Sequence, residues 1–109
     1  MSDQLTVVIY HNRSRDNFRG YQDDHRLVRV FDYQTKLRSP EAICEHAFMV
    51  FNAPEETLEI DDFLLAVGYR ERELRSLSVG DVVVIGETAW ACDRIGWKHV
   101  RLTAEQVTP

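Results

Sequence analysis

The side chains of this chain that could bind a metal ion are those of two cysteines and four histidines, and their spacing is poor for that chemistry. They are Cys44, Cys92, His11, His25, His46 and His99. Structural zinc sites usually take their ligands in close pairs. The only such pair, Cys44 and His46, falls in a segment expected to be helical, where side chains two positions apart diverge. We therefore predict two free thiols, no metal site and no cofactor.

Nucleophilic catalysis has equally little support. No serine lies in a G-x-S-x-G turn, and no glycine-rich phosphate loop is present. His11 ends an apolar run and precedes an arginine-rich segment, so a minimal enzyme centred on this imidazole is one hypothesis. The alternative is that His11 ends a strand and forms a local hydrogen bond. We favour the alternative and assign no catalytic residue.

The segment after His11 mixes cations with aromatic rings in a way that suits nucleic acid. Arg13, Arg15 and Arg19 could bind phosphates, and Phe18 and Tyr21 could stack on bases. The chain carries a net charge of −5, however, which opposes attraction of a polyanion, and it shows no helix-turn-helix or RNP-like motif. A small nucleic-acid-associated regulator is therefore the alternative to a protein-binding module.

Two features favour contact with another protein. Trp97 follows Gly96, whose kink would place the indole at a sheet edge, and tryptophan is frequent at the centre of protein interfaces. Residues 39–62 hold seven acids and no lysine or arginine, which predicts an acidic surface. The acidic residues proposed for contact are Glu55, Glu56, Glu59, Asp61 and Asp62.

Length and composition indicate a single soluble domain spanning residues 1–109. The hydrophobic fraction of 44% and the charged fraction of 28% are those of an ordinary folded protein. No apolar run approaches the roughly 20 residues that a membrane span needs. The N-terminal residues lack the positive charge of a secretion signal, so we expect a cytoplasmic location.

Hydrophobic periodicity predicts strands over residues 5–11 and 25–34, joined by a polar loop. A helix is predicted over 39–52, with Ser39 as N-cap and Pro40 at its first position. Its apolar stripe includes Phe48 and Phe51. A second, shorter helix is predicted over 61–75, where Glu71 and Arg75 could pair one turn apart.

The C-terminal third reads as a turn followed by strands. Ser78, Gly80 and Asp81 form a tight turn in which the glycine takes a positive φ and the carboxylate bonds to nearby amides. Strands are predicted over 82–85, 88–95 and 97–102, with a kink at Gly96, and the last residues are expected to be frayed. The predicted fold is α+β, a small and mostly antiparallel sheet of about five strands with one or two helices packed on one face.

The most patterned stretches, RSLSVGDVVVI and WACDRIGWKHV, resemble the shared block of YodL-like domains. In that block a Ser-Leu-Ser-Val-Gly/Ser-Asp turn precedes a hairpin, here within residues 75–102. The residues that match it are Ser76, Ser78, Gly80, Asp81, Gly96 and Trp97. A looser likeness to short actinobacterial proteins of plasmids, integrative elements and phages spans most of residues 5–100. The resemblance implies an accessory protein of a mobile element, but no activity, cofactor or catalytic residue.

These observations lead to an ordered set of hypotheses. The first is a non-catalytic interaction protein of a mobile genetic element or phage that binds a host or element protein. The second is the nucleic-acid regulator that uses Arg13, Arg15 and Arg19, and the third is the minimal enzyme centred on His11. We expect a monomer or a small homo-oligomer and no membrane partner.

Overall fold

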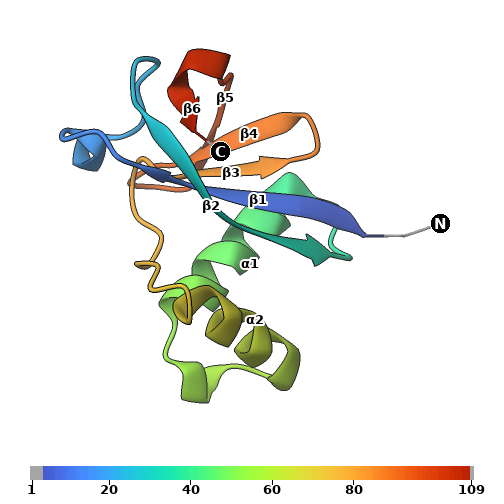
Figure 1. The fold of residues 1–109 in the computed structure, drawn as a ribbon. Coiled ribbons are helices and arrows are strands. Elements are labelled where there is room, and N and C mark those ends of the chain that lie inside the picture. Colours follow the sequence, from blue (N-terminus) through green and yellow to red (C-terminus); the bar gives the residue numbers. More distant parts are fainter. Residues whose placement is uncertain (1–3, 109) are drawn as a thin grey trace.

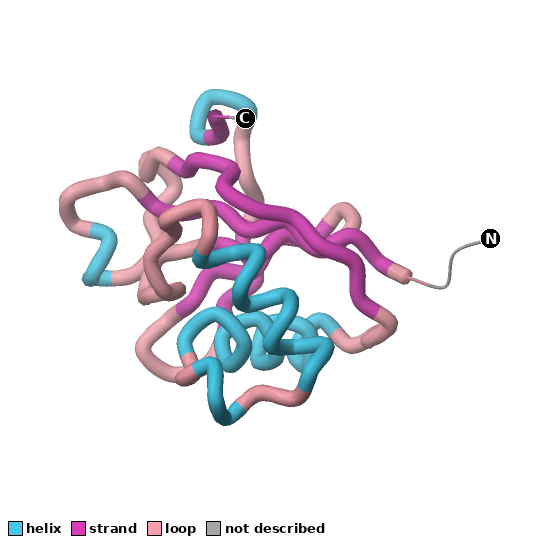
Figure 2. Tube along the Cα trace, turned by 60° about the horizontal axis from the view of Figure 1, so that its bottom comes forward, coloured by secondary structure: helices cyan, strands magenta, loops and turns pink. Residues whose placement is uncertain are grey.

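The computed structural model describes residues 4–108 and shows a six-stranded sheet with two helices on one of its faces (Figures 1 and 2). The strands are β1 (Leu5–Asn12), β2 (Leu27–Thr35), β3 (Val82–Ile85), β4 (Thr88–Cys92), β5 (Trp97–Val100) and β6 (Val107–Thr108). The helices are α1 (Pro40–Asn52) and α2 (Ile60–Arg70), with 3₁₀ turns η1 (Asn17–Arg19), η2 (Glu55–Thr57) and η3 (Ala104–Gln106). The predicted α+β class is confirmed.

The sheet follows the order β5-β4-β3-β1-β2-β6, and every neighbouring pair is antiparallel except β2 and β6. Alternate residues of the strands contribute to two separate cores. Val7 and Ile9 of β1 belong to the core beneath α1 and α2, whereas Val82 of β3 packs with Tyr21 and Leu27 in the second core. The second core covers only part of the face away from the helices, because Thr6 of β1 and Asp32 and Gln34 of β2 are exposed.

Helix α1 forms as the sequence predicts. The hydroxyl of Ser39 accepts a hydrogen bond from the amide of Ala42 at 3.4 Å, and Pro40 takes the first position. Phe51 is fully buried, but the burial expected for Phe48 is wrong, because that ring is 38% exposed. Phe48 lies at the margin of the buried stripe, where the edge of the Trp97 ring packs against it.

Helix α2 is shorter than predicted, ending at Arg70, and the expected ion pair between Glu71 and Arg75 is wrong. A residue with positive φ, Glu73, turns the chain away from the helix axis. Arg75 instead pairs with Asp81. The helix buries Tyr69, which stacks on Phe51 with 4.2 Å between the ring centroids. No helix of the described residues is long and apolar enough to cross a bilayer.

The C-terminal segment is ordered over η3 and β6, so the expected fraying is wrong for the residues described. Gln106 is buried and donates to the carbonyl of His25 at 3.1 Å. Its side chain also closes a capping box with Thr103 and bonds the hydroxyl of Tyr21. Tyr21 and His25 lie 85 and 81 positions earlier in the chain, which is why local sequence could not reveal these contacts.

Two glycines with positive φ provide a test of how closely the turns are packed. At Gly80, with φ of +95°, a Cβ would lie 2.7 Å from the carbonyl oxygen of Asn17, whereas at Gly86, with φ of +58°, it would meet nothing within 4 Å. We expect Gly80→Ala to lower the free energy of unfolding by about 2–4 kcal/mol and Gly86→Ala by about 1 kcal/mol. Urea unfolding followed by circular dichroism measures both, and equal losses would contradict the close packing at Gly80.

Candidate functional site

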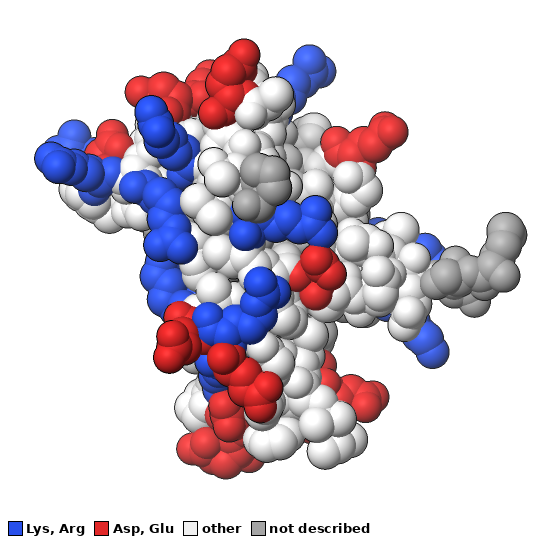
Figure 3. Space-filling view, in the orientation of Figure 1, with Lys and Arg blue, Asp and Glu red and all other residues white. Residues whose placement is uncertain are grey.

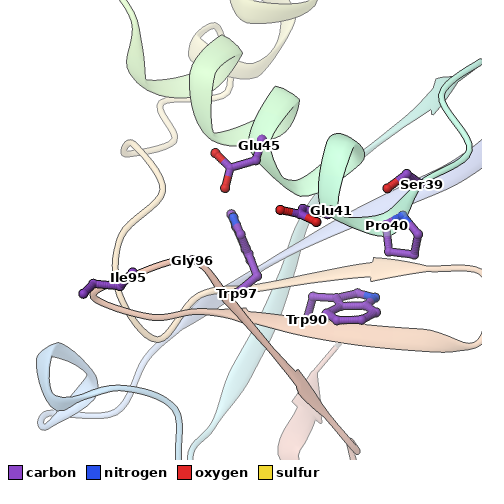
Figure 4. Close-up of a pocket in the computed structure, with 8 residues that line it drawn as sticks. All are labelled: Ser39, Pro40, Glu41, Glu45, Trp90, Ile95, Gly96 and Trp97. Atoms are coloured by element: carbon purple, nitrogen blue, oxygen red, sulfur yellow. The ribbon is translucent and has the colours of Figure 1, made fainter.

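An open groove of about 540 Å³ lies between the start of α1 and the hairpin of β4 and β5 (Figure 4). It is lined by Ser39, Pro40, Glu41, Glu45, Trp90, Ile95, Gly96 and Trp97. Two indole rings from the hairpin face two glutamates from the helix across this groove. We refer to it below as the tryptophan groove.

The register of β4 and β5 places the indoles. Trp90 is opposite His99 and Cys92 is opposite Trp97, so these four side chains share the face that α1 covers. The rings of Trp90 and His99 stack with 4.7 Å between centroids, and the indole N–H of Trp90 donates to the hydroxyl of Thr88 at 3.1 Å. These contacts hold the Trp90 ring at the base of the groove.

Trp97 stands at the first position of β5, an edge strand, and is half-buried. This is the placement that the kink at Gly96 predicts, and Gly96 has a φ of +71°. One edge of the indole packs on Phe48 of α1 with 6.4 Å between centroids. The adjoining Ile95 is 94% exposed, so the rim of the groove is apolar and open to solvent.

The glutamates of the groove are near the surface, and neither forms an ion pair with any described residue. Glu41 and Glu45 are one helical turn apart, so they project from the same face of α1. No lysine or arginine lines the groove. Two carboxylates beside two indole faces suit a cationic side chain, which can bond the carboxylates and lie over a ring.

Sequence reasoning found Trp97 but missed Trp90, Glu41 and Glu45 as members of one site. The sequence shows that the two glutamates are one helical turn apart. The position of α1 opposite the β4–β5 hairpin, however, depends on contacts between segments about 50 residues apart. No local pattern reports such a contact.

Trp97 and the acidic segment, the two features proposed for protein contact, lie on different parts of the structure. Glu55 and Asp62 lie at η2 and the start of α2, at the far end of the molecule from β5 (Figure 1). Glu55 pairs with Arg70 at 3.1 Å and Asp62 with His46 at 2.8 Å. The remaining members, Glu56, Glu59 and Asp61, are exposed.

The Asp81 carboxylate of the Ser78–Asp81 turn bonds to a nearby backbone amide, as the sequence predicts, and belongs to a buried network of polar groups. The Asp81 carboxylate has no exposed surface and accepts from the amides of Asn12 and Ser78 at 2.8 and 2.9 Å. Arg75 donates to both of its oxygens at 2.6 and 2.8 Å. Both oxygens of this carboxylate are therefore occupied, and neither is directed at the tryptophan groove.

His11 is buried and its hydrogen bond is not local, contrary to expectation. Its Nε2 lies 2.7 Å from the hydroxyl oxygen of Tyr69, 58 positions away, and that hydroxyl donates to the carbonyl of Arg75 at 2.6 Å. Burial lowers the pKa of His11 to about 4, so the imidazole is neutral at pH 7. His11 does not line the tryptophan groove, and its burial and its bond to Tyr69 are those of a residue packed in the interior.

The cysteines are free, buried thiols, as predicted. Burial raises the pKa of Cys44 to about 12 and that of Cys92 to about 11, which keeps both thiols protonated and unreactive at pH 7. Cys44 is fully buried, while His46 turns to Asp62, so the two side chains of the Cys44–His46 pair diverge. The described residues contain no cluster of three potential metal ligands.

A second groove, of about 680 Å³, lies between the end of β2 and the two helices. Tyr33 and His46 line it, and neither the hydroxyl of Tyr33 nor Nδ1 of His46 has a hydrogen-bond partner among the described residues. Both atoms are themselves fully covered, so a ligand in this groove cannot reach them without side-chain movement. Exposed polar residues of this groove, such as Gln34, Lys36 and Asp61, accompany only one phenol or indole ring, that of the buried Tyr33, so the tryptophan groove is the better candidate for binding.

No protein-family model matches this chain, and neither does any curated protein or solved structure. The resemblance to YodL-like domains therefore stays a prediction. The tryptophan groove is identified from its geometry alone.

Burial of neutral His11 predicts a particular loss of stability in acid. The unfolded chain binds this proton near pH 6.5 and the folded chain only near pH 4. The stabilising effect is thus complete above pH 6.5 and is lost as the pH falls to about 4, a difference of about 3 kcal/mol. We expect His11→Gln, which cannot titrate, to remove this part of the pH dependence of urea unfolding.

The exposed His99 offers a matched control, because His99→Gln makes the same substitution at the surface of the protein. Its pH dependence should follow that of the unaltered chain. If the free energy of unfolding of His11→Gln shows the same pH dependence as that of the unaltered chain between pH 7 and pH 4, the His11 imidazole is not buried in its neutral form.

Proposed function

We propose that this protein is a non-catalytic binding module whose tryptophan groove accepts a basic segment of a partner protein. The observation that carries the proposal is the pairing of Trp90 and Trp97 with the unpaired carboxylates of Glu41 and Glu45 around one open groove. A lysine or arginine side chain of the partner would lie over an indole and bond a glutamate.

The charges of the groove select the sign of its ligand. The first turn of a helix normally favours anions, but Glu41 already occupies that position in α1. A second anion would be repelled by Glu41 and Glu45, so the preference is for a cation. The exposed Ile95 adds an apolar contact for the residue that flanks it.

The expected affinity is modest. A cation over an exposed ring contributes about 0.5–1 kcal/mol, and more when water is excluded. An exposed ion pair adds up to about 1 kcal/mol. Two contacts of each kind sum to at most about 4 kcal/mol, so a short basic peptide should bind with a Kd on the order of 1 mM, and a folded partner more tightly because it can bury the rim as well.

The absence of a reactive arrangement among the described residues supports a binding role over a catalytic one. The buried acid and imidazole are used in packing, and the serine hydroxyl that lines the groove, that of Ser39, caps α1. With the resemblance to YodL-like domains, we extend the proposal to an accessory protein of a phage, plasmid or integrative element, acting in the cytoplasm on a host or element protein.

Selection from random short peptides displayed on phage tests the chemistry of the groove, whichever protein the partner is. We expect enriched peptides to carry lysine or arginine beside an apolar residue. Binding of a selected peptide, measured by calorimetry, should weaken about tenfold in a Glu41→Gln, Glu45→Gln double variant and at least tenfold in Trp97→Ala.

Phe18→Ala is the matched control for loss of an aromatic ring, because Phe18 is 61% exposed and lies outside the groove. Its peptide affinity should equal that of the unaltered chain. Enrichment of acidic peptides, or unchanged affinity in both groove variants, would contradict the proposal.

A further inference from the structure

A second surface lies on the loop between β1 and β2, where exposed arginines gather. We call it the arginine surface and define it by Arg13, Arg15, Arg19, Arg26 and Phe18. Figure 3 shows basic side chains at the tip of this loop and along the same side of the molecule towards the end of α2. None of the four arginines forms an ion pair with a described residue.

Between residues 13 and 26 the chain carries four arginines and three acids (Asp16, Asp23 and Asp24), which is a formal net charge of +1. Asp16 lies 2.8 Å from Nε2 of His25, and Asp93 borders the loop beside Arg19 and Gly20. The acidic end of the molecule is distant, since the longest extent is 38 Å and the screening length in physiological salt is about 8 Å. The local field at the loop is therefore positive although the chain as a whole is acidic.

The loop that carries these arginines is held in place by a buried amide. Asn12 donates to Nδ1 of His25 at 2.9 Å and to the carbonyl of Gly80 at 3.0 Å, and its oxygen accepts from the amide of Ser14. The amide of Arg13 bonds the carbonyl of Arg26 at 2.8 Å, which sets these two arginines beside each other. Because the loop is ordered before binding, less conformational entropy is lost when the arginines bind a ligand.

The arginines and the exposed phenylalanine of this surface are side chains that suit a nucleic acid, whose phosphates and bases they can bind. All four cations of the surface are arginines, whose planar guanidinium bonds phosphate through two N–H groups, whereas lysine acts as a point charge. Phe18 is 61% exposed and the guanidinium carbon of Arg19 lies 5.6 Å from its ring centroid. An exposed ring beside a cation can stack on an unpaired base while neighbouring arginines bind the flanking phosphates.

From these observations we propose that the arginine surface binds single-stranded nucleic acid through its phosphate backbone, with one base stacked on Phe18. This site is separate from the tryptophan groove, so the protein would join a basic protein segment to a nucleic-acid strand. DNA and RNA share the chemistry that the surface recognises, and the experiment separates them.

Fluorescence anisotropy with labelled oligodeoxyuridylate and oligouridylate, which share one base and differ in the sugar, tests the proposal on the intact chain. We expect binding at low ionic strength that weakens as salt rises, with a slope of log K against log salt of about −2 to −3 for three or four phosphate contacts. Arg15→Ala and Arg19→Ala should each reduce the steepness of that slope by about 0.7. Phe18→Ala should weaken binding about tenfold or more and leave the slope unchanged.

Arg94→Ala is the matched control for charge, since Arg94 is an exposed arginine on the turn between β4 and β5. It should leave affinity and slope unaltered. Trp97→Ala should also leave nucleic-acid binding intact. Peptide binding at the tryptophan groove and nucleic-acid binding at the arginine surface are thus tested by different variants, and either proposal can fail without the other. A difference between the two oligonucleotides identifies the preferred sugar.

Four outcomes would overturn the inference. They are no binding even at low salt, equal loss of affinity in Arg94→Ala, tighter binding of duplex than of single strands, and equal competition by polyglutamate. Binding to vesicles of phosphatidylserine that the same variants abolish, without binding to either oligonucleotide, would reassign the surface to an anionic membrane.

Discussion

The buried carboxylate of Asp81 is the interaction on which the rest of the structure depends. It joins three segments, because it accepts from the end of β1 at Asn12, from the turn at Ser78 and from the chain after α2 through Arg75. Removing one partner of a fully buried ion pair costs about 3–5 kcal/mol, and the cost here is smaller because Arg75 is 40% exposed, but the carboxylate it leaves is fully buried. The backbone of Asp81 also bonds Cys92, which connects the same point to the end of β4.

Both proposed surfaces extend from this centre. Asp81 accepts a hydrogen bond from the backbone amide of Asn12, and the side chain of the same Asn12 orders the loop that carries the arginines. On the other side, the contact between Asp81 and Cys92 sets where β4 ends, and the turn that follows delivers Trp97 to the edge of the sheet. One polar contact in the interior is thus connected both to the loop that carries the arginines and to the hairpin that carries the indoles.

The distribution of charge gives the molecule separate regions of opposite sign. The arginines occupy the loop between the first two strands, while the acids of η2 and the start of α2 lie at the other end (Figures 1 and 3). Two of those acids are paired within the fold with Arg70 and His46. The carboxylates of Glu41 and Glu45, which form no ion pair with a described residue, instead accompany the tryptophans, so the acidic character of the proposed binding groove comes from α1.

The sequence by itself determined the elements whose causes are local. Ser39 and Pro40 begin α1, Gly80 and Asp81 form their turn, and the apolar run of β3 has the predicted bounds, because caps, φ angles and periodicity act over a few residues. Tertiary structure alone decided the contacts across the chain: the bond of His11 to Tyr69, the pairing of Arg75 with Asp81, the ordered end around Gln106 and the facing of Glu41 and Trp90. Such contacts depend on how the helices and the curled sheet pack, and that packing is a property of the whole chain.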